Sequence, residues 1–289
     1  MLESLLQHLE SYAVAAGRII LFNPWFYLGV AVILVLEHII PARRDQRLLS
    51  AGFAEDLLWF GVDGAFRVAL VPAYAALLAT VYERYLSALT VEAVAAWPAA
   101  AAGVFSFVMI DFLGWFHHWV RHKVTAFWYF HTVHHSQREM NLFTDLRVHV
   151  VERLVALTLT FIPLAMLGVD FPTGLYIAFA ITWYTRLYHA NIRTNYGFLK
   201  HVMVTPQSHR IHHSIEPRHQ DKNFGVVLTV WDRLFGTLHS NYDEYPNTGV
   251  ADDRFPAGRS KGLLGALRRV WGQFWFPFGL LLPRRRPVR

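Results

Sequence analysis

The stretches FHTVHHS at residues 130–136 and TPQSHRIHHS at residues 205–214 decide how this chain is interpreted. Both contain the spacing H-x-x-H-H, and a third stretch, DFLGWFHHWVRH at residues 111–122, contains H-x-x-x-H. Residues three or four apart lie on one face of a helix, with Cβ atoms roughly 5–6 Å apart, so each stretch can present two or three imidazoles to one point. Together they supply eight imidazoles, which is more than one ion coordinates comfortably, so two metal ions are expected. The eight are His118, His122, His131, His134, His135, His209, His212 and His213.

The composition excludes several other kinds of metal or redox site. None of the 289 residues is cysteine, which rules out disulfides, zinc sites with thiolate ligands and iron–sulfur clusters. Fourteen of the sixteen histidines fall between His117 and His239, so a transition-metal site must use imidazole and carboxylate ligands. Imidazole suits iron, copper, zinc and nickel alike. The zinc-protease motif H-E-x-x-H is absent, and residues 149–153 read HVVER. A relay of protons between histidines is the alternative without metal.

The hydrophobicity of the chain is typical of a membrane protein. Hydrophobic residues make up 54% of the sequence and charged residues only 17%, against about 25% in soluble domains. The mean hydropathy is +0.27. The net charge of +6 comes from arginines grouped beside apolar stretches, a pattern that favours contact with lipid headgroups over binding of nucleic acid.

Five apolar runs are candidates for membrane helices. They are Trp25–Ile40, Val68–Tyr82, Ala99–Phe116, Leu154–Val169 and Leu175–Tyr188. The sequence DFPTG at residues 170–174 predicts the tip of a helical hairpin, which places His118 and His189 on one membrane face. Arg43, Arg44 and Arg47 follow the first run and assign that face to the cytoplasm.

These patterns predict an all-α integral membrane protein. We expect four to five transmembrane helices and a cytoplasmic helical cap that carries a histidine-rich site for two metal ions. The chain divides into an interfacial amphipathic helix at residues 1–20, a membrane-embedded catalytic domain at residues 21–250, and a basic, aromatic interfacial tail at residues 251–289.

The histidine stretches, together with KNFG at residues 222–225 and WDRLFGT at residues 231–237, resemble the fatty acid hydroxylase/sterol desaturase superfamily of integral-membrane di-iron oxygenases. The resemblance covers roughly Glu37 to His239, and the spacing is also similar to the alkylglycerol monooxygenase branch. It implies that the eight histidines are metal ligands, with His189 in YHAN as a ninth. It further implies two iron ions, O2 as co-substrate, and hydroxylation or desaturation of a C–H bond in a lipid.

Several other residues are candidates for hydrogen bonds that support the ligands. They are Asp111, His149, Glu152, Asn191 and Asp232. His219 and His239 could be either metal ligands or supporting residues. His117 is not taken as a ligand, because it does not share a helix face with His122. For WDRLFGT we favour a packing role, and four aromatic residues are candidates for lining a lipid slot: Phe112, Trp115, Trp183 and Tyr184.

Electrons for an oxygenase must come from another protein. The chain has no G-x-G-x-x-G nucleotide motif, no haem-binding domain and no cysteine for a cluster. We therefore expect an external cytochrome, ferredoxin or reductase to dock on the basic cytoplasmic face. Two other classes stay open: a zinc-dependent membrane hydrolase, and a non-catalytic metal transporter or sensor.

Overall fold

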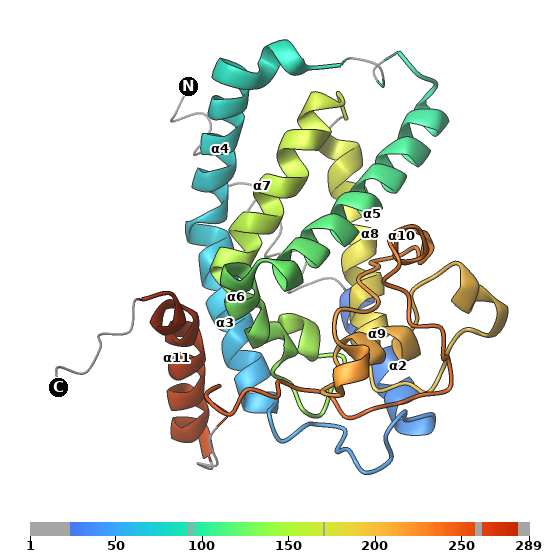
Figure 1. Ribbon diagram of the computed structural model, residues 1–289, viewed down its shortest axis with the longest axis vertical. Helices are drawn as coiled ribbons and strands as arrows, with labels where there is room; N and C mark the ends of the chain where they lie inside the picture. The colour runs from blue at the N-terminus through green and yellow to red at the C-terminus, as the bar shows by residue number, and fades with distance from the viewer. Residues whose placement is uncertain (1–23, 92–93, 95, 170, 258–261, 283–289) are drawn as a thin grey trace.

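The computed structural model describes residues 24–91, 94, 96–169, 171–257 and 262–282, and within these ranges every regular element is a helix, with only isolated β-bridges (Figure 1). The predicted all-α class is thereby confirmed for this part of the chain. The amphipathic helix expected at residues 1–20 lies outside the described residues.

A bundle of helices runs from the top of the molecule in Figure 1 down to its lower part, where the helix at residues 53–69 lies. Its helices are α3 (Phe53–Ala69), α4 (Val71–Val81), α5 (Ala99–Lys123), α7 (Val150–Met166) and α8 (Phe171–His189). Helix α5 packs on both α7 and α8, and α4 packs on α7. A π-helix at Tyr82–Leu86 and a 3₁₀-helix at Ser87–Leu89 end the α4 arm.

The remaining elements lie beside and below this bundle and carry most of the remaining histidines (Figure 1). The α-helices here are α2 (Pro24–Ile39), α6 (Thr125–His135), α9 (Pro206–His212), α10 (Val230–Leu234) and α11 (Gly262–Leu281). The 3₁₀-helices are Thr144–Leu146, Gly197–His201 and Pro217–His219.

Fewer helices meet the length and hydropathy of a membrane span than the four to five expected. Among the described residues, Ala99–Lys123 is long and apolar enough, and a second span exists if Phe53–Ala69 and Val71–Leu89, which meet at 44°, are one bent helix. Helix α7 has only 17 residues, and the last turn of α8 carries Arg186 and His189. These features lower the hydropathy or the length that a span requires.

Two turns bring distant histidines to one end of the bundle. Val124 has an extended backbone, with φ −92° and ψ 107°, and so separates α5 from α6 with a sharp change of direction. Helices α7 and α8 form the predicted hairpin, because Glu152 near the start of α7 and His189 at the end of α8 line the same cavity. His118 lines that cavity too, which confirms that His118 and His189 lie on one side of the fold.

Helix α11, in the segment expected to be a basic, aromatic interfacial tail, packs against α3 and α6. The side-chain oxygen of Gln273 accepts a hydrogen bond of 2.9 Å from Trp59 Nε1, and both residues are buried. Val270 belongs to the same core cluster as Trp59 and Val133. The apolar face of residues 262–281 therefore contributes to the protein core.

A buried ion pair fastens the start of α3 to the residue that follows the 3₁₀-helix Thr144–Leu146. The Arg147 and Asp56 side chains are 2% and 0% exposed, and Arg147 Nε donates to Asp56 Oδ1. Arg147 also donates hydrogen bonds of 2.9 Å to Ser136 Oγ and of 3.1 Å to the Gly52 carbonyl. The guanidinium therefore joins the start of α3 to Ser136, just after α6.

Replacing Arg147 by methionine is expected to lower the free energy of unfolding by about 3–5 kcal/mol, because the Asp56 carboxylate stays buried without its partner. Thermal unfolding in detergent micelles measures this, with exposed Arg138→Met as the matched control. The double variant Arg147→Met, Asp56→Leu should recover part of the loss. A single variant as stable as the parent would show that the ion pair does not hold these segments.

Candidate metal centre

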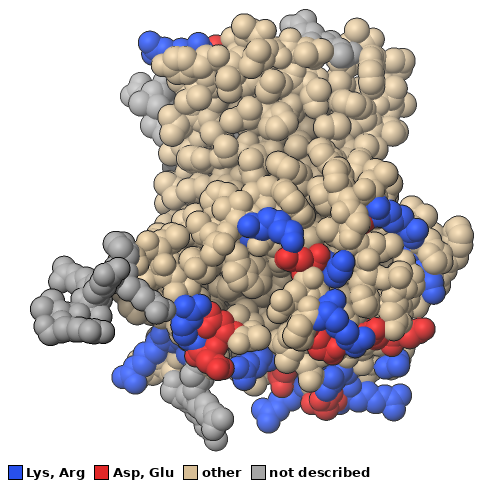
Figure 2. Space-filling model, viewed as in Figure 1, with Lys and Arg blue, Asp and Glu red and all other residues tan. Residues whose placement is uncertain are grey.

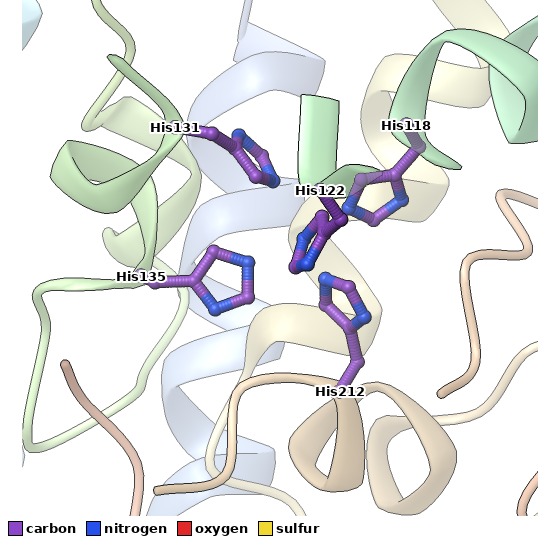
Figure 3. A group of neighbouring side chains, drawn as sticks. All are labelled: His118, His122, His131, His135 and His212. Atoms are coloured by element: carbon purple, nitrogen blue, oxygen red, sulfur yellow. The ribbon is translucent and has the colours of Figure 1, made fainter. Parts of the chain in front are cut away.

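Nine buried or half-buried histidines converge in two groups. Within each group the candidate ligand nitrogens all lie within 4.8 Å of one another. The first group is His118, His122, His131, His135 and His212 (Figure 3), and the second is His134, His189, His209 and His213. These nine are the histidines expected as ligands from the sequence and the resemblance, and the structure brings all of them together.

Each H-x-x-H-H stretch divides between the two groups, which differs from the expectation that one stretch points to one place. On α6, His131 and His135 face the first group while His134 faces the second. At α9 the division is reversed, since His212 joins the first group and the i,i+4 pair His209 and His213 joins the second. Residues i and i+4 share a helix face more closely than their i+3 neighbour, which points aside.

The two groups adjoin each other. The rings of His135 and His213, one from each group, have centroids 4.2 Å apart and planes inclined by only 22°. The rings of His209 and His212 are similarly stacked at 5.2 Å. Two ions held by these groups would therefore be neighbours.

Helix α9 is set in place by its own first turn. The Thr205 side chain accepts a hydrogen bond from Ser208 N, and Ser208 Oγ accepts one from Thr205 N, which forms a capping box with Pro206 at the first helical position. The cap fixes where the helix begins and hence which faces His209 and His212 occupy.

Backbone carbonyls orient three of the rings. The Nδ1 atoms of His118, His212 and His189 lie 3.0, 2.9 and 2.7 Å from the carbonyl oxygens of Phe224, Lys222 and Thr185. A carbonyl oxygen only accepts, so Nδ1 is the donor in each ring and Nε2 keeps its lone pair. Fixing the tautomer in this way is what histidine ligands in metal sites require.

Two carboxylates support further rings of the first group. Glu152 Oε1 lies 3.1 Å from His131 Nδ1 and also pairs with Arg121. Asp221 Oδ1 lies 3.7 Å from His122 Nδ1, and this imidazole, together with Lys123, lowers the pKa of the Asp221 carboxyl to about 2. Glu152 is thus the expected supporting residue that does contact a ring, whereas Asp221 was not anticipated.

The ring nitrogens that face the centre of the first group have no partner among the described residues. All five Nε2 atoms are buried there without a hydrogen bond. A buried, unpaired polar atom costs about 1–3 kcal/mol, so five in one place are unfavourable unless something else binds them. A cation that accepts lone pairs fits this donor set.

The second group has Nε2 atoms packed against one another. His189 Nε2 lies 3.1 Å from His134 Nε2 and 2.9 Å from His209 Nε2. His209 Nε2 in turn lies 3.1 Å from His213 Nε2. A single Nε2 atom cannot form good hydrogen bonds to two neighbouring Nε2 atoms, because it has either one proton or one lone pair. Nitrogen ligands about 2.1 Å from one metal ion and at right angles around it lie about 3.0 Å apart. The second group therefore also fits a metal ion.

The rings on α9 and just after it are in the protonation state that ligands need. Burial, reinforced by the neighbouring imidazoles, lowers the pKa of His209, His212 and His213 well below the usual value. They are neutral at pH 7, so no proton has to leave before a metal binds.

Four of the expected supporting residues do not contact a ligand ring. Buried His149 caps α7, and its Nε2 lies 3.2 Å from the carbonyl of Phe274 on α11. Asn191 Oδ1 accepts hydrogen bonds from Arg43 N and from Arg210. These two expectations are corrected: sequence proximity to the ligands does not turn the side chains toward them.

Asp111 and Asp232 instead hold the loop that carries Phe224. Asp232 accepts from the Phe224 and Gly225 amides at 2.9 and 2.8 Å, and Asp111 accepts from the Val227 amide at 2.7 Å. The Phe224 carbonyl accepts a hydrogen bond from His118 Nδ1. These carboxylates therefore support the first group through the backbone and not by direct contact with an imidazole.

The WDRLFGT segment packs the loop onto α5, in agreement with the packing interpretation. The Trp231 and Phe112 rings have centroids 4.9 Å apart, and those of Phe235 and Trp115 are 4.5 Å apart. Leu234 is exposed. This contact uses two of the aromatic residues that were candidates for lining a slot.

His219 and His239 form a separate cluster with Glu244. His219 Nε2 lies 3.0 Å and His239 Nε2 lies 3.4 Å from the Glu244 carboxylate. Arg218 pairs with that carboxylate at 2.6 Å, so its charge is already balanced. Neither histidine joins the two larger groups.

A cavity of about 330 Å³ opens beside the imidazoles, between α5, α7 and α8. Five candidate ligands line one end: His118, His131, His134, His189 and His209. Small and apolar side chains line the walls, among them Ile110, Ala156 and Ile181. Tyr188 is the aromatic residue of the lining, in place of the four expected from the sequence.

Comparison with known proteins agrees with this arrangement. The model of the family described as fatty acid hydroxylase matches residues 103–237, the segment that holds all nine histidines. Residues 103–237 match the fatty acid hydroxylase family. The resemblance identified in the sequence is confirmed.

Relatives of this fatty acid hydroxylase-like chain are lipid-modifying enzymes by name. "Ornithine lipid hydroxylase OlsE" of Rhizobium tropici is 28% identical over 257 residues, which is 87% of this chain and 76% of that protein. "Alkylglycerol monooxygenase" of Danio rerio is 33% identical over 51% of this chain, and that of Homo sapiens is 29% identical over 62% of it. The chain spans only 33% and 40% of those two proteins. No solved structure matches. Hydroxylases and monooxygenases are oxidoreductases, which confirms the predicted enzyme class.

Proposed function

We propose that this protein is an O2-dependent membrane oxygenase that hydroxylates a C–H bond of a lipid with a pair of iron ions. The observation that carries the proposal is the convergence of nine imidazoles in two adjoining groups, with unpaired nitrogens, at one end of a mainly apolar cavity. The fatty acid hydroxylase match and the names of the relatives support the reaction class.

The distribution of charge supports membrane insertion of the bundle. Four segments contain no Asp, Glu, Lys or Arg: Val71–Val81, Ala99–Ile110, Leu154–Met166 and Thr173–Thr185. Figure 2 shows the upper part of the molecule almost bare of charged side chains, which gather around the lower part. The 17 residues of α7 are about 26 Å long at 1.5 Å per residue, close to the roughly 30 Å of a hydrocarbon core. We place the α3–α4 arm, α5, α7 and α8 in the bilayer as a multi-pass protein, with the histidine end on the cytoplasmic face.

The residues of the protein would hold the metal ions, orient the ligand rings and shield the site from water. The two groups would hold one ion each, and the carbonyls of Phe224, Lys222 and Thr185 keep three rings in the ligating tautomer. Iron bound there would supply activation of O2. The net change is insertion of one oxygen atom into C–H, with O2, two electrons and two protons consumed and one water released. The electrons would come from an external cytochrome, ferredoxin or reductase.

The cavity takes part of a lipid. Its volume of about 330 Å³ is at the lower end of the roughly 300–1,000 Å³ of ligand pockets. Residues of α7 and α8 line it, so the rest of the molecule would stay in the bilayer beside these helices. The named relatives act on an ornithine lipid and on alkylglycerols, so a membrane lipid is the substrate class that we propose.

Removal and replacement of the metal tests the proposal. Protein stripped with a chelator should lose hydroxylation, and Fe²⁺ with O2 and a reductant should restore it whereas Zn²⁺ should not. Mass spectrometry of extracted lipids measures the product, which gains one oxygen atom, and labelled O2 should supply that atom. Turnover with Zn²⁺ in the absence of O2 would contradict the proposal and indicate a hydrolase.

A further inference from the structure

The cavity beside the imidazoles has a cationic side where α3 meets α7. Arg67 and Arg153 both line the cavity, and both pair with the same carboxylate, Asp63. Arg153 donates from Nε and Nη2 at 2.6 and 2.9 Å, and Arg67 donates from Nε at 2.7 Å. Two guanidinium groups thus share one negative charge.

The other charged residues that line the cavity are Arg121, Glu152 and Asp145. Arg121 pairs with Glu152. With Arg67, Arg153 and Asp63 these residues make three cations and three carboxylates, so the set carries no net charge. Within the described chain, the Nη1 and Nη2 atoms of Arg67 have no hydrogen bond, and its side chain is 53% exposed. Arg67 therefore has a guanidinium edge that is accessible and makes no hydrogen bond within the described chain.

A guanidinium with two free NH2 groups matches the geometry of one kind of ligand. Its planar fork binds carboxylate or phosphate oxygens through two parallel hydrogen bonds. A cation beside apolar membrane helices is costly unless it is paired, and such residues are usually functional. Arg67 is paired with Asp63 through Nε only, so an anionic oxygen group is the ligand that its free edge fits.

Resting on the proposed function, we propose that Arg67, supported by Arg153, binds the anionic headgroup of the lipid substrate. The headgroup is a carboxylate or a phosphate ester, and Arg67 selects lipids that carry it over neutral ones. Arg67 is a positioning residue, since it contacts the headgroup and not the carbon that reacts.

The position of the arginines also indicates which part of the lipid is oxidised. Arg153 directly follows Glu152, whose carboxylate lies 3.1 Å from the His131 ring. The cationic side and the imidazoles line one cavity of about 330 Å³, so headgroup and reacting carbon both fit within it. The oxidised carbon is therefore close to the headgroup, and the distal acyl chain extends along Ala156 and Thr160 of α7.

Binding of fluorescent lipids to the detergent-solubilised protein tests this selection without turnover. The probes share one acyl chain and carry a carboxylate, a phosphate or a neutral polyol headgroup. Arg67→Gln should weaken binding of the anionic probes by about 10-fold, the low end for a hydrogen bond to a charged group, and leave the neutral probe unchanged. Arg67→Lys should retain part of the preference, and the carboxylate and phosphate probes show which anion is favoured.

The matched control is Arg84→Gln, at the far end of the α3–α4 arm, which should change none of the affinities. An equal loss for neutral and anionic probes, or no loss for either, would overturn the proposal. Binding is measured with and without bound metal. Selective binding in a protein that hydroxylates no lipid would reject the oxygenase function while leaving the headgroup site standing, so the two failures are distinguishable.

Discussion

Replacing His212 by alanine is expected to abolish lipid hydroxylation and to remove one of two bound metal ions. His212 has its Nε2 at the centre of the first group and its Nδ1 fixed by the Lys222 carbonyl, so both of its contacts belong to the site. Loss of a residue that only supports a ligand lowers metal affinity or activity by about 10–100-fold, so loss of a ligand should exceed about 100-fold. Elemental analysis of purified protein and lipid mass spectrometry measure the two effects.

His209→Ala provides the same test for the second group, where its Nε2 touches those of His189 and His213. His201→Ala is the matched control, since His201 is exposed, lies outside both groups and contacts Tyr242 and Phe198 by its ring. The control should keep full activity and metal content. If His212→Ala keeps two ions and hydroxylates normally, the first group is not a metal site.

The metal ligands could be predicted because the histidine spacing that marks them is local in the sequence. Spacing of three and four residues on one helix face marks His131, His134 and His135 as a unit, whatever the rest of the chain does. The sharing of each stretch between two groups could not be predicted, because it depends on how α6 and α9 face each other across the site. The same holds for Asp221, which lies 3.7 Å from His122 although 99 residues separate the two in sequence.

The helices follow the apolar runs closely, whereas their packing does not follow from hydropathy. Residues 262–281 are apolar and aromatic in a way that also suits a membrane surface, yet Gln273 bonds Trp59 and the helix closes the core beside α3. His149 illustrates the same limit: its ring is directed to Phe274 of this helix, a contact between segments 125 residues apart. Side-chain direction between distant segments is set by tertiary contacts that no local pattern records.

Replacing Asp232 by alanine is expected to cause the largest loss of stability among the supporting residues. Its carboxylate accepts from four donors, which are Trp115 Nε1, the amides of Phe224 and Gly225, and the Thr237 hydroxyl. The Asp232 side chain is buried, and each donor left unpaired costs about 1–3 kcal/mol, so the loss is about 4 kcal/mol or more. That is a large part of the roughly 5–15 kcal/mol that keeps a protein folded.

Asp232→Asn separates the positioning role from folding. The asparagine oxygen can still serve the donors that bond Oδ1, and only the Gly225 amide, which bonds Oδ2, loses its acceptor. The melting temperature should therefore fall in the order parent, Asp232→Asn, Asp232→Ala, with exposed Asp243→Ala unchanged. Because the Phe224 carbonyl orients His118, the asparagine variant should also bind metal about 10–100-fold more weakly at the first group. Normal metal affinity in a destabilised variant would show that the loop supports the fold and not the ligand, since the two measurements respond to different contacts of one carboxylate.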